Sequence, residues 1–161
     1  MPGARRSLLI EPRTSGCGAL CRRLLEELPD WFGIPEAVDE LVGKADRAMA
    51  VVAVEGGLEV GLLTLIRHTE FAAEIEVIAV APAHHRQGIG RAMLDRAERL
   101  MAEDGVEYLE VKTLADTVED EPYERTRAFY AACGFRALQV FPDLWDPENP
   151  ALQLVKRLRA Q

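Results

Sequence analysis

The sequence predicts a mixed α/β (α+β) domain rather than a doubly wound parallel sheet. Three strand patterns directly precede the clearest helical pattern, at residues 88–103, and one later helix then bridges to a neighbouring strand. A chain of 161 residues suits one domain with one hydrophobic core, so we expect a single domain over residues 1–161.

The first third of the chain predicts one strand and two helices. Residues 7–12 form a short apolar run that a proline should end. A stripe of leucines at helical spacing predicts a helix within residues 14–32, which Pro29 should end. Residues 34–45 predict a second helix, because Pro35 stands near its start and apolar residues follow at helical spacing.

The middle of the chain predicts three strands and one strong helix. Residues 48–69 hold two strand patterns around Gly56 and Gly57, which is a hairpin signal. Residues 71–82 form a third strand pattern, closed by a proline. Residues 88–103 place their apolar side chains on one helical face.

The last third predicts one helix among three strands. The strand patterns cover residues 107–114, 135–141 and 151–158. Between the first two strands, residues 123–134 form a helical pattern with Gly134 as its stop.

Composition narrows the classes of function. The net charge is −8, whereas a general nucleic-acid binder normally carries a basic face, so we expect no nucleic-acid partner. An acidic protein suits a cationic substrate such as an amine. No apolar run approaches the roughly 20 residues of a membrane helix, and residues 1–14 lack a signal-peptide core, so we expect no membrane partner and a cytoplasmic protein.

The three cysteines predict neither a disulfide framework nor a metal site. Cys17, Cys21 and Cys133 cannot all pair, and they show no zinc spacing with the histidines. Cys17 and Cys21 stand one helical turn apart, and we expect them to pack as small apolar residues.

A basic turn with two glycines precedes the clearest helix, in residues 84–94 (HHRQGIGRAML). N–H groups at a helix N-terminus lack acceptors and, with the helix dipole, favour an anion. Gly88 and Gly90 let phosphate oxygens approach the backbone, and Arg86 and Arg91 add positive charge. A plain connecting turn with solvated basic residues is the alternative, because a short glycine motif alone is not specific.

The common nucleotide motifs are absent, but another signature fits. There is no G-x-x-x-x-G-K-[ST] run, and Met93 stands at the third glycine of the dinucleotide fingerprint. The turn resembles the [RQ]-x-x-G-x-[GA] signature of the GNAT superfamily of N-acetyltransferases, here His85-Arg86-Gln87-Gly88-Ile89-Gly90. A late F-Y-x-x-x-G-F element, residues 129–135, also resembles this family. Together, in this order, the two motifs extend the resemblance over nearly the whole chain.

The resemblance implies a GNAT-like mixed, mostly antiparallel sheet flanked by helices, with a central strand–glycine turn–helix carrier site. It implies an N-acetyltransferase that moves the acetyl group of acetyl-CoA directly to a primary amine of a small-molecule or peptide acceptor. Many relatives dimerise, so a homodimer is a further expectation. The alternatives are a non-catalytic acyl-CoA-binding sensor or scaffold with the same fold, and a transferase of a longer acyl chain.

The resemblance also assigns residues to the carrier. The backbone of the last strand residues would pair with the pantetheine arm, and the turn would hold the diphosphate. These positions are Ile78, Ala79, Val80, His85, Arg86, Gln87, Gly88, Ile89, Gly90 and Arg91. His85 replaces the usual arginine or glutamine. We expect the site to survive this change with a weaker charge, because backbone amides do most of the phosphate binding in the family.

Three residues are candidates for proton transfer. Glu74 and Glu76 stand two apart on one strand and therefore share a face. Glu74 matches the family's catalytic glutamate and Glu76 is the second choice, while a water chain or two merely solvated carboxylates remain alternatives. Tyr130 matches the tyrosine that in the family points at the departing thiolate, and we favour this role over the alternative of a core side chain with one satisfied hydroxyl.

The acceptor site is less defined by the sequence. Asp116, Glu119, Asp120 and Glu121 form an acidic run, either a solvated loop or the flank of a cleft that attracts a cation. Aromatic residues that either line that cleft or fill the core are Trp31, Phe32 and Trp145.

Overall fold

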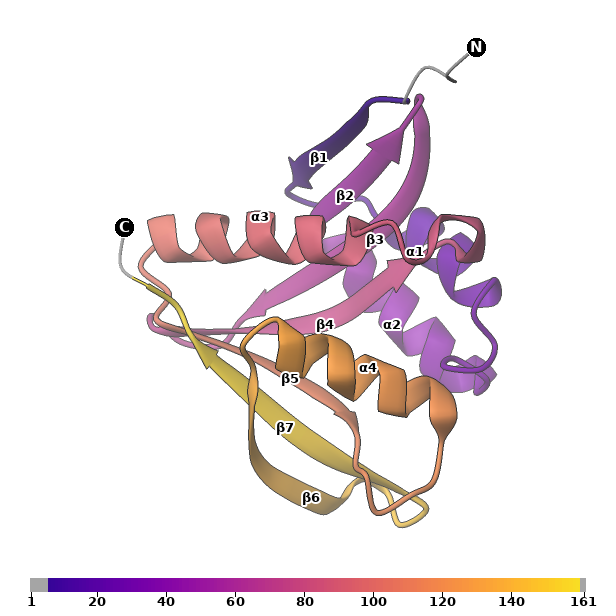
Figure 1. Ribbon diagram of the computed structural model, residues 1–161, viewed down its shortest axis with the longest axis vertical. Coiled ribbons are helices and arrows are strands. Elements are labelled where there is room, and N and C mark those ends of the chain that lie inside the picture. The colour runs from indigo at the N-terminus through magenta and orange to yellow at the C-terminus, as the bar shows by residue number, and fades with distance from the viewer. Residues whose placement is uncertain (1–5, 160–161) are drawn as a thin grey trace. The chain divides into compact units, whose positions relative to one another are not determined.

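The computed structural model describes residues 6–159 (Figure 1). These residues form seven strands and four α-helices in a mixed, mostly antiparallel arrangement, which confirms the predicted fold class. No helix among them is long and apolar enough to span a membrane. The chain divides into two compact units, one of residues up to 65 with 77–97, the other of 66–76 with the residues from 98 on.

The first unit is built on a sheet in the order β1-β2-β3-β4. The strands are β1 (Leu8–Arg13), β2 (Met49–Glu55), β3 (Leu58–Arg67) and the final part of β4 (Ala72–Val80). The first three pair antiparallel in sequence order. The predicted hairpin between β2 and β3 is present because Gly56 and Gly57 have φ values of 58° and 81°, which suit a tight turn.

Strand β1 continues one residue beyond the predicted end. Pro12 lies inside it, opposite Val51, and the strand ends at Arg13. Proline is tolerated here because β1 is an edge strand, where one missing backbone N–H disrupts little of the ladder.

Two helices complete the core of the first unit. Helix α1 (Gly18–Glu26) is shorter than the sequence pattern, and α2 (Pro35–Arg47) begins at its proline as expected. Leucines of α1 pack with the inner side chains of β2 and β3 in one apolar cluster. Cys17 and Cys21 are fully buried in this cluster, which confirms their apolar role, and burial raises the pKa of Cys21 to about 11.

Strand β4 leads through a short 3-10 turn, η1 (Pro82–His84), into α3 (Ile89–Glu103). Helix α3 approaches β3 closely at Gly61, where an added Cβ would lie 3.0 Å from the Cε atom of Met93. Met93 and Leu94 are fully buried, as the helical stripe predicted. The position of α3, and of the turn before it, is therefore set by tight packing on the sheet.

The second unit is a sheet in the order β4-β5-β7-β6. The beginning of β4 pairs parallel with β5 (Tyr108–Leu114), and the remaining pairs, with β7 (Asn149–Arg157) and β6 (Arg136–Asp146), are antiparallel. Strand β6 runs five residues past the predicted end at residue 141, with register irregularities that accommodate Pro142 at the sheet edge.

Helix α4 (Glu121–Ala132) of the second unit starts earlier than the sequence pattern suggested. The Asp120 carboxylate accepts the backbone N–H of Tyr123 at 3.2 Å and caps the helix. The helix stops as predicted, because Gly134 takes a left-handed φ of 93° immediately after the C-cap residue Cys133.

Candidate functional site

The end of β4 and the turn after it form one continuous backbone segment of the first unit. Ile78 and Val80 are half-buried, while Ala79 between them is 4% exposed. The backbone N–H of Ala81 donates to Val60 of β3 at 2.9 Å, which fixes the strand end.

The N-terminus of α3 presents N–H groups without helical acceptors. The first i→i−4 bond runs from Ala92 to Gly88 at 3.0 Å, so the N–H groups of Ile89 and Gly90 precede the helical ladder. Gly88 has a φ of 77°, and a Cβ built on it would meet nothing within 4 Å. Open space, donors outside the helical ladder and the helix dipole together suit an anion.

Two basic side chains accompany this turn. Arg86 and Arg91 are both exposed, and the exposed Gln87 stands between Arg86 and Gly88. Guanidinium groups suit phosphate because their N–H groups can bind two oxygens at once. The predicted turn residues are thus brought together in a geometry that can hold a diphosphate.

His85 lies differently from the other turn residues. Its Nε2 atom is 2.6 Å from the backbone oxygen of Val80, and a carbonyl only accepts, so the ring nitrogen donates. The ring of Trp31 meets the imidazole edge-on, with centroids 6.2 Å apart. The sequence did not reveal this contact, because the signature position gives no sign of which side chain or backbone group it binds.

Glu74 sits in a polar network of the second unit. It is 7% exposed; its Oε1 lies 2.7 Å from Nε2 of His68 and its Oε2 accepts from Nζ of Lys112 at 2.8 Å. The ammonium of Lys112 also donates to Glu110 at 3.0 Å, opposite Glu74 in the β4–β5 register. Both carboxylate oxygens of Glu74 therefore have partners in this network. Glu76, two residues further along β4, is half-buried.

Lys112 is the cation of this network. Ligand atoms of His68, Glu74 and Glu110 lie within 4.8 Å of one another, a grouping that could hold a metal ion. The Lys112 ammonium already bonds both carboxylates. Burial lowers the pKa of Lys112, but its hydrogen bonds to Glu74 and Glu110 outweigh burial and hold that pKa above its usual range. The alternation of Glu110 and Lys112 along β5 was the only sequence signal for this pairing.

Tyr130 is buried in the second unit, at 2% exposed. Its ring centroid lies 5.3 Å from those of Phe129 and Phe135, and Phe135 donates its backbone N–H to the backbone carbonyl oxygen of Tyr130 at 3.0 Å. The F-Y-x-x-x-G-F element is thus a helix end closed by packed rings. Burial, and then Cys133, raise the pKa of Tyr130 far above its usual range, so its hydroxyl keeps its proton.

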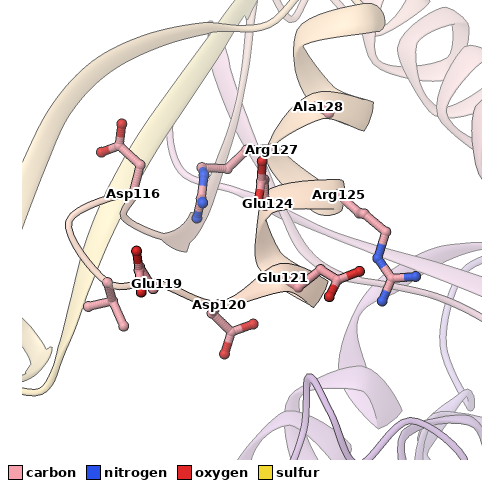
Figure 2. Close-up of a pocket in the computed structure, with 9 residues that line it drawn as sticks. Asp116, Glu119, Asp120, Glu121, Glu124, Arg125, Arg127 and Ala128 are labelled. Atoms are coloured by element: carbon pink, nitrogen blue, oxygen red, sulfur yellow. The ribbon is translucent and has the colours of Figure 1, made fainter.

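The predicted acidic run surrounds a pocket of about 980 Å³ in the second unit (Figure 2). Figure 2 shows that Arg125 and Arg127 leave α4 in different directions. Arg127 donates to the backbone oxygen of Leu114 at 2.7 Å. The lining residues are Asp116, Val118, Glu119, Asp120, Glu121, Glu124, Arg125, Arg127 and Ala128. The pocket carries more carboxylates than guanidinium groups, so it favours a cation.

The aromatic candidates separate into two groups. Trp31 and Phe32 are partly buried against the core of the first unit, as the core alternative predicted. Trp145 is 49% exposed on β6 of the second unit.

Comparison with known proteins points to one family. A family model described as an acetyltransferase (GNAT) domain matches residues 46–137, more than half of the chain. No curated protein sequence matches the chain. Among solved structures, an acetyltransferase attributed to the GNAT family from Desulfovibrio desulfuricans is similar, with 24% identity and a TM-score of 0.79 over 95% of this chain and 100% of that one.

Two further structures have more specific names. The ribosomal-protein-S18-alanine N-acetyltransferase from Escherichia coli has 16% identity and a TM-score of 0.74, covering 96% of each chain. An aminoglycoside 6′-N-acetyltransferase complexed with coenzyme A has 18% identity and a TM-score of 0.71, covering 95% of this chain and 98% of that one. At these identities the likeness is one of fold.

Proposed function

Because the chain belongs to the GNAT acetyltransferase family, an N-acetyltransferase class that uses acetyl-CoA, we propose that it transfers the acetyl group directly to a primary amine of a small-molecule or peptide acceptor. The observation that carries this proposal is the N-terminus of α3. There the N–H groups of Ile89 and Gly90 precede the helical hydrogen bonds, and the space beside Gly88 is open. A diphosphate matches such a site in charge and geometry.

Holding the donor is the first requirement of the reaction. In the proposal, backbone groups of Ile78, Ala79 and Val80 pair with the pantetheine amides, since the end of β4 runs directly into the turn. The N–H groups from Gln87 to Gly90 bind the diphosphate, with Arg86 and Arg91 at its rim. These contacts with the carrier would orient its thioester for attack.

Proton transfer is the second requirement. The amine must lose a proton before it attacks the thioester, and the leaving thiolate must gain one. Tyr130 is the proposed donor, because its raised pKa keeps the phenol protonated. Glu74 or Glu76, directly or through water, is the proposed base. The pH profiles of kcat for Glu74→Gln and Glu76→Gln decide between them: the base is the residue whose loss removes the rise in kcat with pH.

The acceptor is proposed to be cationic. The net charge of −8 and the acidic pocket of the second unit both attract ammonium groups. The aminoglycoside and ribosomal-protein acetyltransferases show that this fold serves small-molecule and protein amines alike. A cytoplasmic location belongs to the proposal, since the three cysteines are free thiols.

A homodimer is also part of the proposal. Four large apolar side chains stand exposed on β6: Leu138, Val140, Leu144 and Trp145. A second copy would shield them from water. Light scattering coupled to gel filtration measures the mass directly.

The donor is tested by a thermal-shift titration with acetyl-CoA. Binding to the folded chain alone stabilises it by about 2.7 kcal/mol at a hundred times the Kd, so Tm must rise with ligand concentration. A panel of amines, with released thiol as the readout, then identifies the acceptor. An unchanged Tm together with no calorimetric heat from coenzyme A or any acylated form of it would end the proposal.

A further inference from the structure

The turn that carries the proposed diphosphate site contains a backbone conformation that is unfavourable on its own. Arg86 is the one non-glycine residue between positions 6 and 159 with a positive φ, at 62°. An L-residue in this left-handed region is disfavoured by its own Cβ, so neighbouring contacts must stabilise it. The two residues that precede Arg86 are both histidines, and both make contacts that leave the turn.

His85 connects the turn to the strand before it. Its Nε2–H donates to the Val80 oxygen at 2.6 Å, and Trp31 packs edge-on against the ring. The side chain therefore bridges the last residue of β4 and the residue next to Arg86. It contributes a ring N–H to this contact and needs no charge to do so.

His84 connects the same turn to another strand. Its Nδ1 lies 2.8 Å from Oε2 of Glu55, the last residue of β2, although the pair lacks the alignment of a hydrogen bond. Both side chains are largely buried, with 18% and 20% of their areas exposed. Since Nδ1 is buried and has no other close polar partner among the described residues, the Glu55 carboxylate compensates its desolvation.

We propose that His85, His84 and Glu55 are positioning residues that hold the turn in the shape that binds the carrier's diphosphate. The inference rests on the proposed function, because it concerns the same turn. The two histidines use different ring nitrogens and contact different strands. His85 uses Nε2 to contact Val80 of β4, and His84 uses Nδ1 to contact Glu55 of β2. Neither side chain is itself a phosphate ligand, so His85 replaces the family's usual arginine or glutamine by fixing the backbone.

Crossed substitutions test this division of roles. A glutamine amide nitrogen can take the place of Nε2, and an asparagine amide nitrogen that of Nδ1. His85→Gln and His84→Asn should therefore keep the Kd for coenzyme A, by calorimetry, within about twofold of the unchanged chain, whereas His85→Asn and His84→Gln should raise it about tenfold, as expected for one lost contact of this kind. In steady-state kinetics, His85→Asn and His84→Gln should raise KM for acetyl-CoA and leave kcat at saturating acetyl-CoA unchanged.

Two controls separate positioning from general damage. Urea unfolding of each variant reports global stability, and Glu40→Gln removes an ion pair with Lys44 on α2 of the same unit. This control should bind coenzyme A as the unchanged chain does. If asparagine or glutamine at one position prevents folding, the crossed pair at the other position still tests the proposal.

The outcomes distinguish the two proposals. If the unchanged chain binds no coenzyme A, the proposed function fails and this inference fails with it. If the unchanged chain binds but all four histidine variants bind equally well, or if kcat falls instead of KM rising, the positioning role is overturned while the proposed function stands.

Discussion

Gly88 combines a left-handed backbone with open space where a side chain would stand. We expect Gly88→Ala to cost about 1–2 kcal/mol of stability, from the unfavourable φ alone. Its effect on coenzyme A should be larger, because the new methyl group occupies the approach of the phosphate. Calorimetry should show the Kd rising more than about tenfold, beyond the effect of the lost stability.

Gly105 provides a matched control for this substitution. It has a φ of 87° and, like Gly88, nothing within 4 Å of an added Cβ, but it lies in the loop after α3. Gly105→Ala should therefore lose similar stability and keep its affinity for coenzyme A. Equal affinities of the two variants would contradict the diphosphate site at Gly88.

Tyr130→Phe tests the proposed proton donor. Removal of one hydroxyl should lower kcat by about a hundredfold, the scale of a lost general acid, and leave coenzyme A binding unchanged. Tyr123→Phe is the matched control, since Tyr123 is also a tyrosine of α4; it is half-buried, and its pKa is raised to about 12 by burial and then by Asp120. A Tyr130→Phe enzyme with full turnover would mean that another group donates the proton.

Tyr130 should also make the free energy of unfolding decrease at alkaline pH. Its pKa is raised by burial, so the folded chain keeps this proton above about pH 10, where an unfolded tyrosine releases it. The stability linked to Tyr130 is therefore complete below about pH 10 and is lost as pH rises further, at up to about 1.4 kcal/mol per pH unit. Urea unfolding at pH 9 and pH 11 should show a smaller decline for Tyr130→Phe than for the unchanged chain.

Single residues also mark how far the sequence predicts the candidate site. The glycine turn was predictable because its donors come from consecutive backbone positions. The partners of His84 and Glu74 were not, since Glu55 and Lys112 are distant in the sequence and reach them only through strand register. His85 was expected to affect charge, whereas it binds the Val80 backbone.

Helix α3 and strand β3 depend on one close approach. A methyl group at Gly61 would lie 3.0 Å from Cε of Met93 and 3.2 Å from Cβ of Ala53. We expect Gly61→Ala to destabilise the chain by about 1–3 kcal/mol, the usual cost of overpacking. The double variant Gly61→Ala/Met93→Val should recover part of this loss in urea unfolding, because the shorter side chain frees the space. No recovery would mean that Ala53, rather than Met93, limits the space.

The elements with regular patterns were predicted well, and those set by local contacts less so. Strands β2 to β5 and helix α3 follow continuous apolar runs or a clear helical stripe, which the sequence displays directly. Strand β6 was expected to end at residue 141, because Pro142 interrupts the strand pattern there. The start of α4 depends on the Asp120 cap, which an apolar pattern does not register.

The net charge of the whole chain predicts a salt effect. With −8 charges, the protein should attract a polyamine such as spermidine more strongly at low ionic strength. KM for such an acceptor should rise several-fold from about 0.01 M to 1 M salt, as the Debye length falls from about 30 Å to 3 Å. KM for the anionic acetyl-CoA should not rise in parallel through this long-range effect, and steady-state kinetics on both substrates check the difference.

The acidic pocket gives a variant for the same measurement. Replacing Glu119, Glu121 and Glu124 with glutamine removes three charges from its lining. The salt dependence of KM for the polyamine should then flatten. An unchanged dependence would place the attraction elsewhere on the surface.

Each edge strand of the sheet, β1 and β6, contains a proline that limits how molecules can associate through their backbones. Pro12 lies in β1 and Pro142 in β6, and a proline brings a ring where an incoming ladder would need a backbone donor. Strand-by-strand growth into fibrils is thereby hindered at both borders. The homodimer proposed above would therefore use side-chain surfaces such as the apolar one on β6 rather than the backbone of an edge strand.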